Sequence, residues 1–276
     1  MDQFRADYLE RFRGQWTGGL ARLLTEGSLF PGRQDHALTE TAPGHHLLRL
    51  DRWLGWFLDS LAAQVSKERF LLVLTADHGI VPFPEMTSAR GGRAGRLSLV
   101  GLIRETRGAL ASRWGTDFDL SFDSGLLTAD VVGLRAHGID LDSLAAALAV
   151  RVGRPPGVAR VDTPRSLREA PTSDLIASRW RRSLPQNLGW LICVTAEPGY
   201  IWGYGPGSTD HGTPDPDDVN APIGFMGPGV RPGVHYRPIR TVDIAPSLAA
   251  LLGLHPGERV DGEGSRRWQV ADDPDR

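Results

Sequence analysis

The feature that most constrains the fold is a short, continuously apolar segment that ends in charged residues. Residues 70–75 read Phe-Leu-Leu-Val-Leu-Thr, and Ala-Asp-His-Gly follows at 76–79. Such a run, bounded by turn residues, is typical of a strand buried on both faces of a parallel sheet. Residues 47–63 carry apolar side chains at helical spacing, and a helix followed by such a strand is half of a βαβ unit. The sequence therefore predicts an α/β fold.

The other segments alternate between helical and strand patterns. We expect helices over 8–27, 97–114, 143–152, 173–184 and 242–252, and strands over 126–134, 158–162 and 190–196, while residues 223–226 form a short apolar segment. A Gly-rich link at 91–95 and the mixed pattern after it predict a smaller α+β cap or insert subdomain at approximately 86–185. The whole chain, 1–276, is expected to form one domain around this insert.

Composition excludes several function classes. The formal net charge of −2 gives no basic field for nucleic acid or an anionic membrane surface, so neither is expected as a partner. The only cysteine, Cys193, has apolar neighbours and is expected to be a buried strand thiol, with no intrachain disulfide. No apolar run approaches the ~18 residues of a membrane span, and the N-terminus is polar. As written, the chain is expected to be cytoplasmic.

The first candidate site follows the apolar run. Asp77 and His78 lie where a predicted strand ends, and open α/β sheets bind ligands outside the carboxyl ends of their strands. Beyond the strand end both side chains can turn toward one ion, and Gly79 permits that bend. Carboxylate and imidazole together suit zinc. The alternative is an Asp-His pair that only caps the next turn.

Two loops supply further candidates. His211 lies in the Gly/Pro-rich segment 208–214, a poor place for a core histidine, although a surface histidine is the alternative. Thr41 lies in the loop 38–45. A threonine hydroxyl near zinc can act as a nucleophile because the metal lowers its pKa. The alternative is an ordinary loop threonine.

Taken together, these segments resemble the alkaline phosphatase superfamily, in its branch of zinc-dependent alkaline phosphatases and type I phosphodiesterases or nucleotide pyrophosphatases. The similar segments, in the family's order, are 2–9 ("VDQxRxDYL"), 39–45 (the nucleophile loop), 74–79 ("TADHG"), 210–219 with 227–233, and 241–253 with 261–262. The resemblance implies an α/β sandwich with a mostly parallel central sheet and helices on both faces.

The same resemblance implies a reaction. Metal-dependent hydrolysis of a small-molecule phosphate ester would proceed through a covalent phospho-threonine on Thr41. Asp2, Asp77 and His78 would hold one zinc, and His211 would belong to the second. Members of this family are often exported.

The chain also departs from the family pattern. The family carries a long segment after the nucleophile loop, with an Asp and a His of the second zinc site and a phosphate-contacting asparagine. Here 43–45 runs almost directly into the helix predicted at 47–63, and Lys67, the only lysine, is expected in a surface turn. The family's first strand would precede Asp2. The alternative function is therefore a truncated, catalytically impaired remnant that binds at most one metal ion, unless His45, His46 or the pair at 35–36 replaces a lost ligand.

Overall fold

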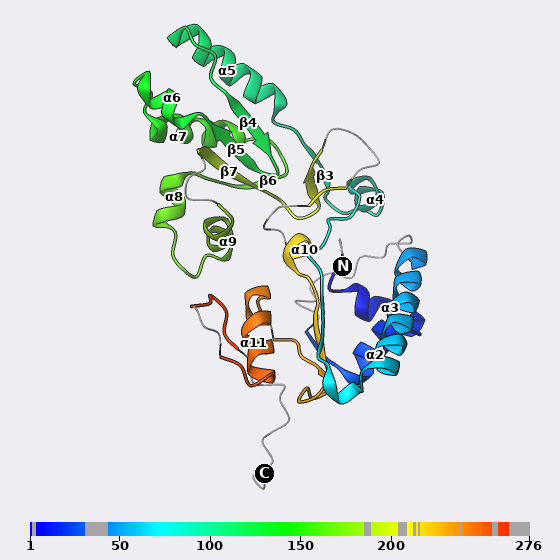
Figure 1. Cartoon of the computed structure of the whole chain (residues 1–276). Coiled ribbons are helices and arrows are strands. Elements are labelled where there is room, and N and C mark those ends of the chain that lie inside the picture. Colours follow the sequence, from blue (N-terminus) through cyan, green and yellow to red (C-terminus); the bar gives the residue numbers. More distant parts are fainter. Residues whose placement is uncertain are drawn as a thin grey trace. The chain divides into compact units, whose positions relative to one another are not determined.

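The computed structural model divides the chain into two compact units. It describes residues 1, 4–30, 44–184, 189–203, 209–211, 214, 216–237, 239–255 and 259–264. Unit 1 comprises Met1–Gly79 and Asn220–Arg276, and unit 2 comprises Ile80–Val219. Unit 2 is drawn mainly in green in Figure 1, and its chain is continuous, whereas unit 1 is built from both ends of the sequence.

Unit 1 contains a four-stranded mixed sheet in the order β10-β1-β9-β2. Its strands are β1 (Ser28–Phe30), β2 (Leu72–Thr75), β9 (Ile223–Met226) and β10 (Gly233–Val234). β1 and β10 pair in parallel, but β9 runs antiparallel to both of its neighbours, β1 and β2. The α/β expectation is confirmed, and residues 72–75 of the apolar run form a strand. A mostly parallel sheet was expected, however, whereas β2 pairs with β9 in the antiparallel direction and only Leu74 in β2 is buried. The sheet is mixed because β9 returns between two strands that run in the same direction.

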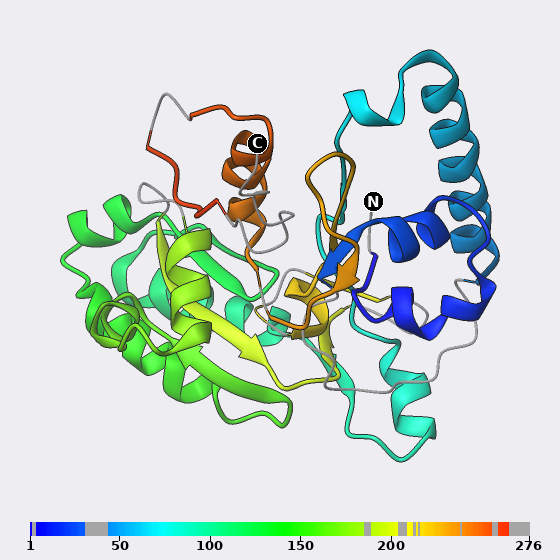
Figure 2. The same ribbon diagram turned by 90° about the horizontal axis from the view of Figure 1, so that it is seen from below.

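Helices cover both faces of this sheet, as expected (Figure 1, Figure 2). They are α2 (Gly19–Glu26) and α3 (Gly44–Gln64) on one face and α11 (Ile244–Leu251) on the other. Side chains alternate between the two cores, as the pleat of a strand requires. Leu29 and Leu74 pack with Leu23 and Leu58 of α2 and α3. Phe30 and Phe225 pack with Leu248 of α11.

The prediction of one continuous helix over 8–27 is wrong, because residues 12–18 between its two ends are not α-helical. This segment forms α1 (Tyr8–Arg11), the 3-10 turn η1 (Arg13–Gln15) and then α2. Asp51 of α3, fully buried, accepts hydrogen bonds from the N–H groups of Thr17, Gly18 and Leu20. A Cβ at Gly18 would lie 2.2 Å from the Asp51 carbonyl oxygen, so only glycine fits this approach. The break is thus stabilised by a residue far along the chain.

Unit 2 is built around a second, antiparallel sheet in the order β4-β5-β7-β6. Its strands are β4 (Leu120–Asp123), β5 (Leu126–Ala129), β6 (Val158–Asp162) and β7 (Trp190–Ala196). Its helices are α4 (Pro84–Ala89), α5 (Val100–Trp114), α6 (Val131–Ala136), α7 (Leu141–Val152), α8 (Pro164–Glu169), α9 (Leu175–Ser183) and α10 (Pro216–Val219). β3 (Gly95–Leu97) and β8 (Tyr200–Trp202) form a separate parallel pair.

Two expectations for unit 2 have clear outcomes. The strand expected over 126–134 is wrong beyond Ala129, because the Asp130 carboxylate accepts the Gly133 N–H at 2.9 Å and starts helix α6. The strand expected over 190–196 is confirmed as β7. Cys193 lies at its centre with no exposed surface, and burial raises the pKa of its thiol. Cys193 is therefore the buried strand thiol that the sequence predicted.

Two surface features complete the description. Lys67 lies in the 3-10 turn η2 (Lys67–Arg69) with 63% of its side chain exposed, opposite Glu26, so the predicted surface-turn lysine is confirmed. A further 3-10 turn, η3 (Thr241–Asp243), leads into α11. Within the described segments, every helix is too short or too polar to cross a bilayer.

Candidate functional site

Asp77 and His78 lie side by side just after β2, as the sequence predicted. The Asp77 Oδ1 accepts the His78 main-chain N–H at 2.8 Å, and the Asp77 Oδ2 lies 3.8 Å from His78 Nε2. The two side chains are 55% and 24% exposed, so both can be reached from solvent. One carboxylate oxygen and one imidazole nitrogen therefore lie next to each other at the carboxyl end of a strand.

The tautomer of His78 follows from its hydrogen bond to the main chain. Its Nδ1 lies 2.6 Å from the carbonyl oxygen of Gly79. Because a carbonyl can only accept, Nδ1 carries the proton of this contact, and in the neutral form of the ring Nε2 is then the nitrogen that can bind a metal. A zinc-ligating histidine commonly donates its other N–H to a carbonyl in this way, which fixes the ring orientation. The donor types at Asp77 and His78 thus fit zinc.

The main chain of Met1 lies beside this site. The N-terminal nitrogen of Met1 donates to the Thr75 carbonyl at 3.0 Å, and the Asp77 N–H donates to the Met1 carbonyl at 3.3 Å. This is the hydrogen-bond pattern of a parallel bridge, with Met1 opposite Ala76. Asp2, the predicted third ligand, is outside the described residues, but the residue before it is held at the end of β2.

His211 belongs to unit 2 and shares one local feature with His78, namely that the carboxylate of the preceding residue accepts its main-chain N–H. The Asp210 Oδ1 accepts the His211 N–H at 2.9 Å. Val81 holds this loop, since its N–H donates to the Asp210 carbonyl at 3.4 Å and its carbonyl accepts the Thr209 hydroxyl. Burial raises the pKa of the Asp210 carboxyl, and the hydrogen bond from His211 N–H opposes that rise. The predicted loop histidine is therefore anchored to its own unit.

The remaining predicted site residue, Thr41, is outside the described residues, as is the pair at 35–36. The side chain of His45 is not described either, and His46 is exposed on the first turn of α3. Within the part of the chain that is described, no group of three or more His, Cys, Asp or Glu side chains could hold a metal ion. The structure thus brings together two of the predicted ligands, Asp77 and His78.

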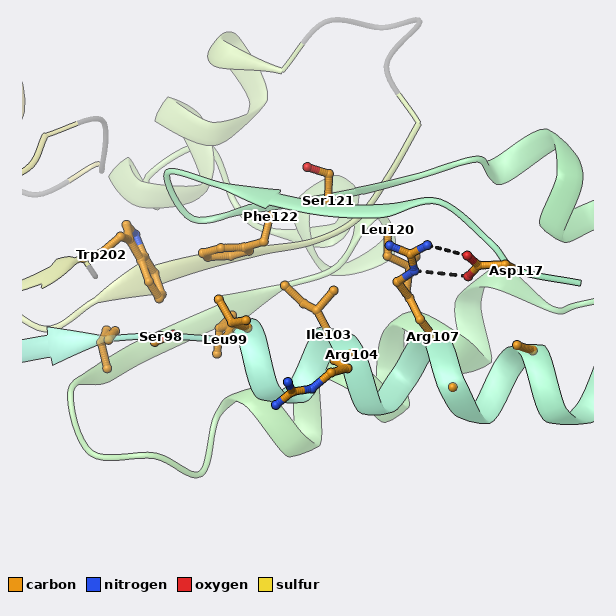
Figure 3. Close-up of a pocket in the computed structure, with 15 residues that line it drawn as sticks. Ser98, Leu99, Ile103, Arg104, Arg107, Asp117, Leu120, Ser121, Phe122 and Trp202 are labelled. Atoms are coloured by element: carbon orange, nitrogen blue, oxygen red, sulfur yellow. Dashed lines mark hydrogen bonds and ion pairs between the residues drawn. The ribbon is translucent and has the colours of Figure 1, made fainter. Parts of the chain in front are cut away.

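The sequence did not single out a cleft in unit 2 beside helix α5. Figure 3 shows side chains of α5, including Ile103, facing Phe122 of β4, with Trp202 at one end and the Arg107–Asp117 ion pair at the other. The helical spacing of Val100, Ile103 and Arg107 is a signal for the helix side. The other wall comes from distant strands, which no local pattern reveals.

Known proteins match the chain over part of its length. No protein-family model matches it. It is 28% identical over 209 residues to a protein named calcium-transporting ATPase of Myroides odoratus, and 27% identical over 221 residues to the alkaline phosphatase PafA of Elizabethkingia meningoseptica. Each match covers 75% of this chain but only 38% of the relative. A shorter stretch of 46 residues is 56% identical to the alkaline phosphatase PhoK of Sphingomonas sp..

Solved structures of an alkaline phosphatase and of a phosphodiesterase are similar to the fold of this chain. The crystal structure of wild-type PafA superposes with a TM-score of 0.68 and 25% identity, over 76% of this chain and 40% of PafA. Human ectonucleotide pyrophosphatase/phosphodiesterase 5 superposes with a TM-score of 0.52 at 17% identity, over 83% of this chain and 53% of that protein, which concerns the fold alone. The chain thus spans about two fifths of the length of PafA.

Proposed function

This chain belongs to the alkaline phosphatase superfamily over part of its relatives' length, and on that premise we propose that it hydrolyses small-molecule phosphate esters at a metal centre. The observation that carries the proposal is the Asp77–His78 pair at the end of β2, with the His78 ring oriented by the Gly79 carbonyl. The donors are one oxygen and one imidazole nitrogen, so zinc is the proposed metal. The cap or insert subdomain proposed at approximately 86–185 lies within unit 2.

The proposed roles follow the resemblance of the sequence. Asp77 and His78, with Asp2, would hold one ion, and His211 would hold a second. A bound zinc would stabilise charge on the phosphoryl oxygens and favour ionisation of a hydroxyl. Thr41 Oγ would form the new bond to phosphorus while the bond to the ester oxygen breaks and the alcohol leaves with a proton. Water would then cleave the bond between Thr41 Oγ and phosphorus and restore the hydroxyl, releasing inorganic phosphate from a monoester or a phosphate monoester from a diester.

A second candidate function is an impaired remnant that binds at most one metal ion. It is favoured by the beginning of α3 at Gly44, directly after the segment that contains Thr41. In the family, the ligands that complete the second metal site lie between these two features. The remnant and the enzyme therefore differ in how many ions the chain binds.

Zinc content and hydrolysis test both candidates together. Elemental analysis of the purified full chain would measure zinc per chain for the native sequence, Asp77→Ala, His78→Ala and the control His255→Ala, an exposed histidine near the end of the chain. Hydrolysis of p-nitrophenyl phosphate and bis(p-nitrophenyl) phosphate would be measured alongside, with Thr41→Ala as the nucleophile variant.

The outcomes separate the candidates. Two zinc ions and hydrolysis that disappears in Thr41→Ala support the enzyme, and the preferred ester then shows whether a monoester or a diester is the substrate. One ion lost in His78→Ala, with no hydrolysis of either ester, supports the remnant. Zinc content that is the same in Asp77→Ala, His78→Ala and His255→Ala contradicts both.

A further inference from the structure

Unit 2 contains a cleft of about 480 Å³ whose lining residues are all outside the proposed metal centre. The walls are the end of β3, the first turns of α5, strand β4 and the end of β8 (Figure 3). This volume lies in the range of small-molecule binding sites, about 300–1,000 Å³, which are mostly apolar with a few placed polar groups. The composition of the walls decides which class of molecule would fit.

The helix side of the cleft is a single stripe of α5. Its members lie at helical spacing: Val100, Ile103, Arg104, Arg107, Gly108 and Ala111. Gly108 lies inside the helix, where glycine is less stable than alanine. A Cβ at this position would meet nothing within 4 Å, so packing does not demand glycine. The small residue leaves room at this part of the stripe.

The opposite wall is aromatic. The rings of Phe122 and Trp202 meet edge to face, with their centroids 4.8 Å apart and an interplanar angle of 75°. Trp202 is 7% exposed and packs into the main core of unit 2, so its position is fixed by that core. Ile103 extends toward Phe122 from the helix (Figure 3). Aromatic side chains prefer edge-to-face or offset stacking with further rings, so this wall suits a flat aromatic group.

The charge of the lining is unbalanced. Arg107 donates to both carboxylate oxygens of Asp117, at 3.2 and 2.6 Å, so these two charges compensate each other. Arg104, which also lines the cleft, is exposed and forms no ion pair with any residue in the described segments. Arginine matches the planar geometry of a carboxylate or sulfonate. The lining thus carries one positive charge in excess.

We propose that this cleft binds a small aromatic monoanion, with its ring system between Ile103 and Phe122 and its carboxylate or sulfonate on Arg104. The ring would fill the apolar space beside Gly108. The anionic group would compensate the excess charge at the helix side. The Arg107–Asp117 pair would close the far end without taking part in charge recognition.

Calorimetric titration of the full chain with 2-naphthoate tests the proposal, and two variants target the site. Arg104→Gln removes the charge, and binding should weaken about tenfold, because a charge-assisted hydrogen bond is lost. Gly108→Leu fills the space with a better helix former, and binding should fall below detection. The matched controls are Arg113→Gln and Gly101→Leu on the same helix, outside the lining, and both should bind within about twofold of the native chain.

The titrations have outcomes that support the proposed site and outcomes that contradict it. One 2-naphthoate per chain, weakened in both site variants and retained in both controls, supports the site. The absence of saturable binding at millimolar 2-naphthoate overturns it, as does equal binding in Gly108→Leu when far-UV circular dichroism shows an intact fold. Equal affinity for the uncharged 2-naphthalenemethanol would overturn the role of Arg104, and tighter binding of dodecanoate would overturn the aromatic assignment.

Discussion

Replacement of Asp51 should destabilise unit 1 more than most single substitutions would. Its buried carboxylate accepts the N–H groups of Thr17, Gly18 and Leu20 at 2.8, 2.8 and 2.7 Å. In Asp51→Ala the Leu20 N–H stays buried without an acceptor, which costs about 1–3 kcal/mol. The other two N–H groups are partly buried and recover some hydration, so each costs about 1 kcal/mol. The free energy of unfolding should therefore fall by about 3–5 kcal/mol.

Urea unfolding, followed by far-UV circular dichroism and tryptophan fluorescence, measures this loss. Asp59→Ala on the same helix is the matched control, since its side chain is 61% exposed and its ion pair with Arg22 is at the surface. Surface pairs of this kind contribute about 0–1 kcal/mol. Asp51→Asn keeps one acceptor oxygen, so its loss of unfolding free energy should lie between the losses in Asp51→Ala and Asp59→Ala. A loss below about 1 kcal/mol in Asp51→Ala would refute the reasoning that this carboxylate holds α2 and α3 together.

Other predictions concern unit 2. The N–H of Ala177 donates to Asp174 and is the main reason why the pKa of that carboxyl is lowered, so its contribution to stability is lost as the pH falls below about 4. Asp174→Asn should flatten this acid-side fall in urea midpoint, and equal slopes would contradict the assignment. Cys193, a buried thiol with a raised pKa, should react with dithionitrobenzoate only in denaturant, and fast labelling of the folded chain would contradict its burial. At Gly125 φ is +87° and a Cβ would lie 2.5 Å from a carbonyl oxygen of β7, so Gly125→Ala should lower the free energy of unfolding by about 2–4 kcal/mol. The control Gly115→Ala has φ +69° with nothing within 4 Å and should cost about 1 kcal/mol, and equal losses in both would exclude the clash.

The sequence alone predicted those helices and strands whose pattern of apolar residues lies within one short segment of the chain. The apolar run that becomes β2, the apolar strand that becomes β7 and the long helix α5 were each visible in a few adjacent residues. The positions of Asp77 and His78 followed from the same logic, because a strand end was predicted just before them. The donation from His78 Nδ1 to the Gly79 carbonyl was not predictable, since it depends on how the chain turns after the strand.

Other features depend on contacts between distant residues. The break between α1 and α2 is stabilised by the Asp51 carboxylate, which lies more than 30 residues further along the chain. Gly14, Gly18 and Gly19 are a local signal for this break that the helical spacing of the apolar residues outweighed in the prediction. The antiparallel direction of β9 was not predictable either. It depends on β9 pairing with both β1 and β2, which are distant from it in the sequence. The strand pattern at 126–134 continued past Ala129 in the sequence, but the Asp130 cap took precedence over the apolar residues that follow it. The cleft beside α5 likewise needs Phe122 and Trp202, which are far apart in the chain.

The place of β9 in the sheet of unit 1 has a consequence for the order of folding. β1 and β2 make no hydrogen bonds to each other, because both pair with β9, which is synthesised only after all of unit 2. As the chain leaves the ribosome, residues 80–219 can fold as a continuous segment while unit 1 still lacks its central strand. Pairings of such high sequence separation form slowly. Refolding of unit 1 should therefore be the slower phase, and its two early strands should be the segments most in need of protection from aggregation.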